Sequence, residues 1–219
     1  MNISPLNNLR IGVATAYGKP YFRFVNSLKE LDLRYDSFLP EHIPAYTGNL
    51  VFTTRDEAPL HAGVPLLFED VFEKHPTVLA GIILEKLELN FEREELVIGV
   101  DPGSRIGLSI FYYGIEIESS LYSSVEELVL HIIAILAGLK AKTKIVKIGN
   151  GNMPIAREIG NLLNLKFCSS FELEFVDERR TSLKIKNYNQ RGRRDRLSAK
   201  YITQRQGYRH FVLPLSITG

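Results

Sequence analysis

The sequence predicts an α/β protein in two parts: a small α/β domain over residues 1–90, and a larger domain over residues 95–219 built on a mixed five-stranded sheet with flanking helices. Apolar runs of strand length alternate with longer segments whose apolar residues recur at helical spacing, which is typical of sheets covered by helices. Seven of the ten prolines lie between Pro5 and Pro76, so the first part has short elements separated by turns. The charged stretch Glu88–Glu95 is interpreted as the linker.

In the first part, two strands and two helices are expected. The strands are Leu9–Tyr17 and Gly48–Thr54, which are rich in strand-forming residues. Helical spacing of apolar residues predicts a helix over Tyr21–Leu33 and a second over Leu67–Glu88, which its proline interrupts. The segment Asp56–His61 holds two acids and a histidine, and we interpret it as a surface turn.

The second part predicts the order β-β-β-α-β-α-β-α. Three consecutive strands form a meander, and two crossover units then extend the sheet in parallel. Ser124 and Glu127 form a capping box at the start of the first helix, and Pro154 lies in the first turn of the second. The expected strands are Leu96–Asp101, Ile106–Gly114, Ile115–Ser123, Thr143–Gly149 and Glu172–Glu178, and the expected helices are Ser123–Leu139, Met153–Leu165 and Arg193–Gly207.

Charge is distributed unevenly along the chain. The segment Arg179–Arg209 holds 11 basic residues and one acid, so its net charge is +10. Because the whole chain sums to +2, the remainder carries −8. A basic tract beside acidic sequence indicates a polyanionic partner, although a solvated basic loop has the same composition.

The cellular setting follows from two features. The single Cys168 cannot form an intrachain disulfide, and Met1–Arg10 lacks the apolar stretch of a signal peptide, so a cytoplasmic protein is expected. The longest apolar stretch, Leu128–Leu139, is well short of the roughly 20 residues that span a bilayer. No membrane partner is therefore expected.

Four acids follow the strand ends of the second part. Asp101 ends the first strand, Asp177 and Glu178 end the fifth, and Asp195 opens the last helix, which returns toward the first strand. The first, fourth and fifth strands run parallel, and α/β sheets bind ligands at the carboxyl ends of such strands. Clustered carboxylates are stable mainly around a cation, and hard oxygen ligands without His or Cys favour Mg²⁺ or Mn²⁺. Each acid also has a structural interpretation, as a turn residue, a helix N-terminal charge or the partner of a neighbouring arginine.

Three segments, VIGVDPGSRIGLSIF, FVDERRTS and RDRLSAKYI, resemble the ribonuclease-H-like fold on this strand order. More narrowly they resemble the RuvC-like resolvases and their YqgF relatives, which process nucleic acids. The resemblance covers about residues 96–207. It implies that Asp101, Glu178 and Asp195 are the catalytic metal ligands, with Asp101 bridging two ions of Mg²⁺ or Mn²⁺ in phosphodiester hydrolysis.

Two features depart from the RuvC pattern. RuvC enzymes place a glutamate at the end of the fourth strand, where this chain has KIGNGN, so Glu178 must stand in for that ligand. RuvC also tends to carry a second aspartate in its last helix, at the place that Ser198 holds here.

A basic segment lies between the last two acids and is expected to cover the site. Its cationic side chains would bind phosphates, and Tyr188 would stack on an unpaired base. The residues expected to bind nucleic acid are Arg179, Arg180, Lys184, Lys186, Tyr188, Arg191, Arg193 and Arg194.

These features together predict a Mg²⁺- or Mn²⁺-dependent nuclease that acts on structured nucleic acid, either a DNA junction of the Holliday type or a structured RNA. Two alternatives stay open. A degenerate homologue that binds nucleic acid without cutting it is favoured by the missing fourth-strand acid. An actin-like-fold nucleotide-binding protein also ends its first strand in Asp-x-Gly. Binding of branched DNA or structured RNA, against binding of Mg·ATP, separates these classes.

Overall fold

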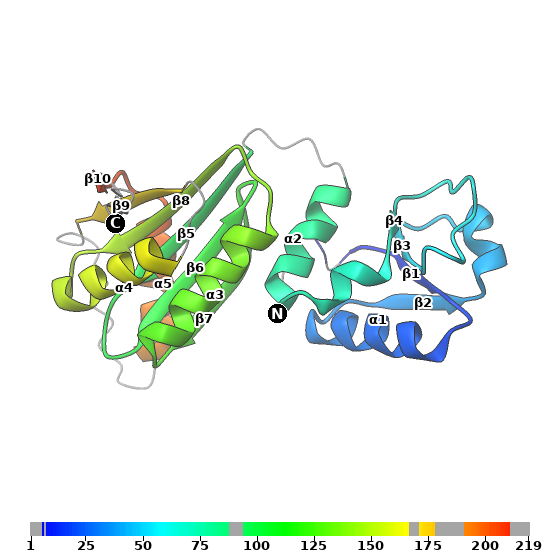
Figure 1. Ribbon diagram of the computed structural model, residues 1–219, viewed down its shortest axis with the longest axis horizontal. Helices are drawn as coiled ribbons and strands as arrows, with labels where there is room; N and C mark the ends of the chain where they lie inside the picture. Colours follow the sequence, from blue (N-terminus) through cyan, green and yellow to red (C-terminus); the bar gives the residue numbers. More distant parts are fainter. Residues whose placement is uncertain (1–5, 7, 88–93, 167–170, 178–190, 211–219) are drawn as a thin grey trace, which may run out of the picture. The chain divides into compact units, whose positions relative to one another are not determined.

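The computed structural model describes residues 6, 8–87, 94–166, 171–177 and 191–210 (Figure 1). The chain divides into two compact units, residues 1–90 and residues 91–219. Each unit has its own sheet flanked by helices, one of four strands and one of six. The α/β class predicted from the sequence is therefore confirmed. None of the helices in the described part of the chain combines the length and the hydropathy that crossing a bilayer requires.

The first unit is built on a fully parallel sheet with the order β2-β1-β3-β4. The strands are β1 (Ile11–Ala14), β2 (Tyr35–Phe38), β3 (Leu50–Phe52) and β4 (Leu66–Leu67), and the helices are α1 (Gly18–Glu30), η1 (Pro40–Ala45), η2 (Glu69–Glu73) and α2 (Pro76–Lys86). The sequence predicts β1, β3 and α1. Of the predicted helix Leu67–Glu88, only the part after the proline is α2; the part before it is wrong, because Leu67 belongs to β4 and Glu69–Glu73 form η2. The sequence does not predict β2, whose four residues YDSF include two exposed polar side chains and so lack an apolar run.

The first sheet has an apolar layer on each face, because strand residues alternate in direction. Ala14 and Val51 lie on one face and form a buried cluster with Ile43 of η1. On the other face Phe52 contacts Phe24 of α1, with ring centroids 6.1 Å apart. Both faces are thus covered, as a parallel sheet requires.

The second unit is built on a mixed sheet with the order β10-β9-β8-β5-β6-β7. β5 pairs antiparallel with β6 and parallel with β8, β6 pairs antiparallel with β7, and β8 pairs parallel with β9. This is the meander followed by two parallel crossovers that the sequence predicts. The strands are β5 (Glu95–Asp101), β6 (Ile106–Tyr112), β7 (Ile115–Tyr122), β8 (Thr143–Gly149), β9 (Glu172–Val176) and β10 (Tyr208–His210).

Helices cover both faces of the second sheet. In Figure 1, α3 (Val125–Gly138) and α4 (Met153–Lys166) lie in front of the sheet and α5 (Arg191–Thr203) lies behind it. The predicted start of α3 is confirmed, since the Ser124 hydroxyl accepts a hydrogen bond of 3.2 Å from the Glu127 amide. The two layers bury most of β5 and β6.

The end of the second unit differs from the prediction of a five-stranded sheet and a helix over Arg193–Gly207. The helix ends at Thr203, and β10 then adds a sixth strand antiparallel to β9. Gly207 permits this path, because a Cβ there would lie 2.7 Å from the Cβ of Glu174. A strand of three residues is too short to show an alternating apolar pattern, so the sequence does not predict β10. Without that signal, the predicted helix extends past Thr203.

Candidate functional site

Asp101 ends the central strand of the second sheet. Leu96, Ile98 and Val100 are fully buried on one face of β5, so alternation places Gly99 and Asp101 on the opposite face. The Asp101 side chain is neither exposed nor fully buried. A carboxylate at this position stands at the carboxyl end of a parallel pair, where such sheets bind ligands.

Two glycines bring helix α5 onto this same face. A Cβ on Gly99 would lie 2.4 Å from the Ala199 carbonyl oxygen, and a Cβ on Gly107 would lie 2.2 Å from the Asp195 carbonyl oxygen. Gly107 is the cross-strand partner of Asp101. Directly paired residues of antiparallel strands face the same side, so Asp101 and Asp195 converge on the α5 face of the sheet, across Gly107.

Asp195 is the fifth residue of α5, and the first turn of this helix holds no acid. It therefore does not open the helix as predicted, and its interpretation as a first-turn charge is wrong. Its carboxylate Oδ2 lies 3.8 Å from Nε of Arg105, in the turn that follows Asp101. The Asp195 side chain is 24% exposed and that of Arg105 is 49% exposed, so the pair lies at the surface.

Polar networks hold α5 against the sheet below this point. Lys200 donates a 2.7 Å bond to Glu116, which also accepts a 2.9 Å bond from the Ser109 hydroxyl of β6. Further along, Lys147 of β8 donates a hydrogen bond to the backbone carbonyl of Arg205, just beyond the end of α5. These contacts, together with the glycine packing, fix the height and rotation of α5 and thereby the position of Asp195.

The third expected ligand and most of the basic segment lie outside the described residues. Glu178, Arg179, Arg180, Lys184, Lys186 and Tyr188 belong to this group, as does the side chain of Arg191. Arg193 and Arg194 are described, and both are exposed near the start of α5. Asp177 is described too, and its backbone carbonyl accepts a 3.0 Å bond from Arg205.

The end of β8 carries no acid, in agreement with the sequence. Gly149 ends the strand, and the Asn150 amide donates a 3.0 Å bond to the Val176 carbonyl. This edge of the sheet is thus closed by backbone hydrogen bonding. Among the described residues of this edge, the candidate site consists of Asp101, Asp195 and Arg105.

Sequence reasoning missed three features that the structure makes clear. Arg105 and Gly107 lie within the quoted first motif, but only the paired strands show that they face Asp195. The third feature is Glu57 in the first unit, within the turn Asp56–His61. Its carboxylate accepts bonds from the Thr15 hydroxyl, from the Ala16 amide at 2.7 Å and from the Thr54 hydroxyl at 2.7 Å. The turn exists as predicted, but Glu57 ties it to the ends of β1 and β3.

These contacts set the ionisation of Glu57. Burial raises the pKa of its carboxyl group, but the hydrogen bonds from Thr15, Ala16 and Thr54 outweigh burial and hold the pKa below its usual value. All three donors are neutral and belong to the chain itself. Glu57 is therefore a fixed, ionised acceptor with its partners already in place.

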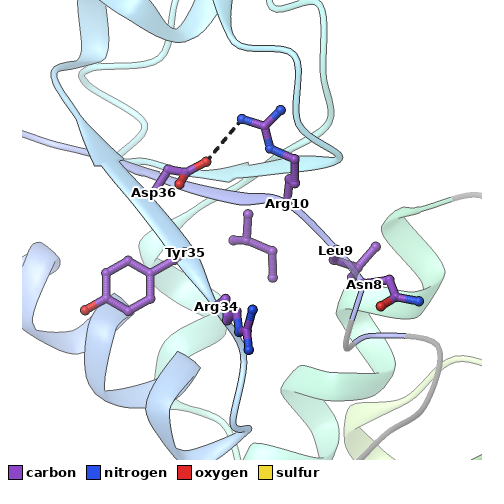
Figure 2. A pocket seen from close by; sticks show the side chains of 7 residues that line it. Asn8, Leu9, Arg10, Arg34, Tyr35 and Asp36 are labelled. Atoms are coloured by element: carbon purple, nitrogen blue, oxygen red, sulfur yellow. Dashed lines mark hydrogen bonds and ion pairs between the residues drawn. The ribbon is translucent and has the colours of Figure 1, made fainter.

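The first unit also has a pocket of about 350 Å³ at the amino ends of β1 and β2 (Figure 2). Arg10, Arg34, Tyr35 and Asp36 line it, and Arg10 pairs with Asp36 at 3.5 Å across exposed side chains. Parallel sheets bind ligands at the opposite ends of their strands. The pocket has polar walls, but the charged side chains described there do not form an arrangement that indicates a reaction.

Comparisons with known proteins give little more. No family model and no curated protein matches this chain. Among solved structures, it is similar to the MID-PIWI domains of the N. crassa QDE-2 Argonaute, at 11% identity and a TM-score of 0.28, covering 91% of this chain and 81% of that one. It is also similar to Aa-Ago with externally bound siRNA, at 13% identity and a TM-score of 0.27, covering 76% of this chain and 35% of that one. At these TM-scores the likenesses establish neither fold nor function.

Proposed function

We propose that the second unit binds nucleic acid and hydrolyses its phosphodiester bonds with the help of Mg²⁺ or Mn²⁺ held by Asp101, Asp195 and Glu178. The observation that carries this proposal is the convergence of Asp101 and Asp195 on one face of the sheet across Gly107. The two residues are 94 positions apart in the chain. A solvated surface acid has no need of a glycine that brings a helix backbone this close.

The donor set fits a hard divalent cation. Carboxylate oxygens are the ligands that Mg²⁺ and Mn²⁺ prefer, and no His or Cys precedes or follows either acid in the quoted motifs. Bound there, the ions would neutralise the phosphodiester and lower the pKa of water for its hydrolysis. Asp101 contributes rigidity because β5 is paired on both sides. Asp195 contributes a ligand whose position is set by the packing of α5.

The nucleic acid would approach from the start of α5. Arg193 and Arg194 are exposed there, and the first turn holds no acid to oppose a phosphate. The amino end of a helix favours anions as well. We extend this interface to Arg179, Arg180, Lys184, Lys186, Tyr188 and Arg191, and we keep the domain boundaries 1–90 and 95–219 and a cytoplasmic location as parts of the proposal.

One observation favours a second candidate, a protein that binds nucleic acid without cutting it. The end of β8 offers no acid, and Asp195 is already paired with a guanidinium. A site with fewer ligands holds fewer ions, and two ions about 3.5–4 Å apart are needed to stabilise both the attacking and the leaving oxygen. Such a protein would still bind nucleic acid through the basic residues, but it would not hydrolyse the phosphodiester bond.

A single screen separates these candidates. Full-length protein is incubated with four-way DNA junctions, duplex DNA, structured RNA and single-stranded RNA, in Mn²⁺, in Mg²⁺ and in EDTA. The nuclease proposal expects one substrate class to be cut in metal and spared in EDTA. Tight binding without cutting would identify the second candidate. Binding of Mg·ATP with no affinity for any nucleic acid would overturn both.

A further inference from the structure

Arg105 contacts the candidate site from the turn between β5 and β6. Its Nε lies 3.8 Å from Oδ2 of Asp195, and its Nη1 lies 3.9 Å from the place that a Cβ on Gly192 would take. The guanidinium thus extends along the first turn of α5, from Gly192 to Asp195. It is a cation that the chain itself places beside Asp195.

The contact is loose. Hydrogen bonds between nitrogen and oxygen are typically about 2.7–3.2 Å long, so 3.8 Å is a charge contact without a hydrogen bond. About half of the Arg105 side chain is exposed, so water screens the attraction. A divalent cation that takes Asp195 as a ligand therefore has little to displace.

We propose that Arg105 is a positioning residue that exchanges partners: it pairs with Asp195 in the absence of metal, and it turns to a phosphate of the nucleic acid when a divalent cation occupies Asp195. This inference rests on the proposed metal site. Arginine suits the second role, because its planar fork can donate two hydrogen bonds to one phosphate. Arg105 and the preceding Ser104 are both exposed, which gives the side chain room to move.

The exchange has a reciprocal consequence. If the cation frees Arg105 for the phosphate, metal raises the affinity for nucleic acid, and nucleic acid raises the affinity for metal by the same factor. In the absence of metal, Asp195 competes with the phosphate for Arg105, so Arg105 adds less to nucleic-acid binding than it does with metal bound. A fixed phosphate contact would add the same amount under both conditions.

The test measures Mn²⁺ binding by electron paramagnetic resonance and nucleic-acid binding by fluorescence anisotropy, on the wild type, Arg105→Gln, Arg105→Lys and Arg157→Gln. Arg157 is an exposed arginine of α4 that serves as the matched control. The nucleic-acid probe is the substrate that binds best in the screen above. Circular dichroism melts check that each variant folds.

Removing one positive charge about 4 Å from a carboxylate is expected to tighten Mn²⁺ binding about fivefold in R105Q, the scale of a unit-charge interaction in water. The loss of nucleic-acid affinity in R105Q should be larger in Mn²⁺ than in EDTA. R105K keeps the charge, so its Mn²⁺ affinity should equal that of the wild type while part of the metal-dependent gain is lost. R157Q should change neither quantity.

Two results would overturn the inference. One is an R105Q variant that binds Mn²⁺ no more tightly than the wild type, which would make the pair purely structural. The other is an equal loss of nucleic-acid affinity with and without Mn²⁺, which would make Arg105 a fixed contact. If the wild type itself binds no Mn²⁺, the proposed metal site is wrong. The partner exchange of Arg105 is then overturned as well, because no cation displaces it from Asp195. If R105Q does not fold, the R105K result decides.

Discussion

The two sheets use carboxylates differently at the carboxyl ends of their strands. In the first unit, Glu57 closes the edge between β1 and β3, and its three donors are neutral groups of the chain itself. In the second unit, Asp101 and Asp195 meet at the edge of β5, and Asp195 faces a half-exposed arginine at 3.8 Å. One carboxylate has short, fixed partners, and the other has a distant, charged one.

The comparison separates a structural acid from a candidate ligand. Glu57 already has the hydrogen bonds that an ionised carboxylate needs, so a cation there would have to break them. Asp195 has a loose charge contact with Arg105, and two carboxylates close together favour a cation between them. Removing the carboxylates of each edge separately by mutation therefore tests whether they have different roles.

The largest effect is expected from Asp101→Asn. This change keeps the shape and removes a charge from the proposed site, so metal-dependent cleavage should fall on the order of 10²–10³-fold, the scale for losing one preorganised electrostatic group. Single-turnover cleavage in Mn²⁺ measures it, with Glu57→Gln as the control that should keep the wild-type rate. Equal rates for D101N and the wild type would remove Asp101 from the mechanism.

A smaller effect is expected from Gly107→Ala. The added Cβ would lie 2.2 Å from the Asp195 carbonyl oxygen, so α5 must shift. Overpacking of this kind costs about 1–3 kcal/mol. Denaturant unfolding measures the loss, and Mn²⁺ titration should show weaker binding because Asp195 has moved.

The matched control is Gly18→Ala in α1, where a Cβ meets nothing within 4 Å. It should leave both quantities close to those of the wild type. If G107A and G18A behave alike, the close approach of α5 to β6 is absent in solution.

Glu57→Gln is expected to lower the free energy of unfolding by about 1.5–3 kcal/mol at neutral pH, the scale for hydrogen bonds to a charged group. Because the folded pKa of Glu57 lies below its unfolded value, its contribution is present above the unfolded pKa and is lost as pH falls through the folded pKa. The variant's deficit should therefore shrink below about pH 4.5, near the unperturbed glutamate pKa.

Thermal melts across this pH range check the prediction, with the exposed neighbour Asp56→Asn as control. D56N should follow the wild type throughout. A deficit in E57Q that persists unchanged at low pH would show that the ionised carboxylate is not what stabilises this turn.

The smallest effect is expected from replacing both Arg193 and Arg194 by Ala. Each phosphate contact that is lost should reduce the slope of log affinity against log salt by about 1. Affinity should fall uniformly across sequences, because phosphate contacts carry no sequence information. An unchanged slope would leave these arginines as solvated surface residues.

The sequence is sufficient to predict strands that have a long apolar run and helices that begin at a recognisable capping residue. The apolar runs of β5, β6 and β8 and the Ser124 cap of α3 predict their own structure, and the strand directions follow from the lengths of the connections. Strands β2, β4 and β10 could not be found, because β2 is polar and the other two have only two and three residues. Their pairing comes from neighbours that no local pattern encodes.

In the candidate site too, some residues are predicted from the sequence and others are found only in the structure. Asp101 and Asp195 are identified from the sequence because the motifs resemble those of a known family. The roles of Gly99, Gly107 and Arg105 require the register of β5 with β6 and the position of α5. The position of α5 depends on contacts between residues that are 88 to 100 positions apart in the chain. Glu57 was interpreted as a turn acid for the same reason, since its partners lie in two other segments.

The central claim is that Asp101 and Asp195 hold one divalent cation together. Mn²⁺ titration of the wild type, Asp101→Asn, Asp195→Asn and the double variant, followed by electron paramagnetic resonance, tests it directly. The account predicts that the wild type binds Mn²⁺, that each single change weakens binding at least about tenfold, which is 1.4 kcal/mol, and that the two changes are not additive because both ligands serve one ion. Equal Mn²⁺ binding by all four proteins would contradict it.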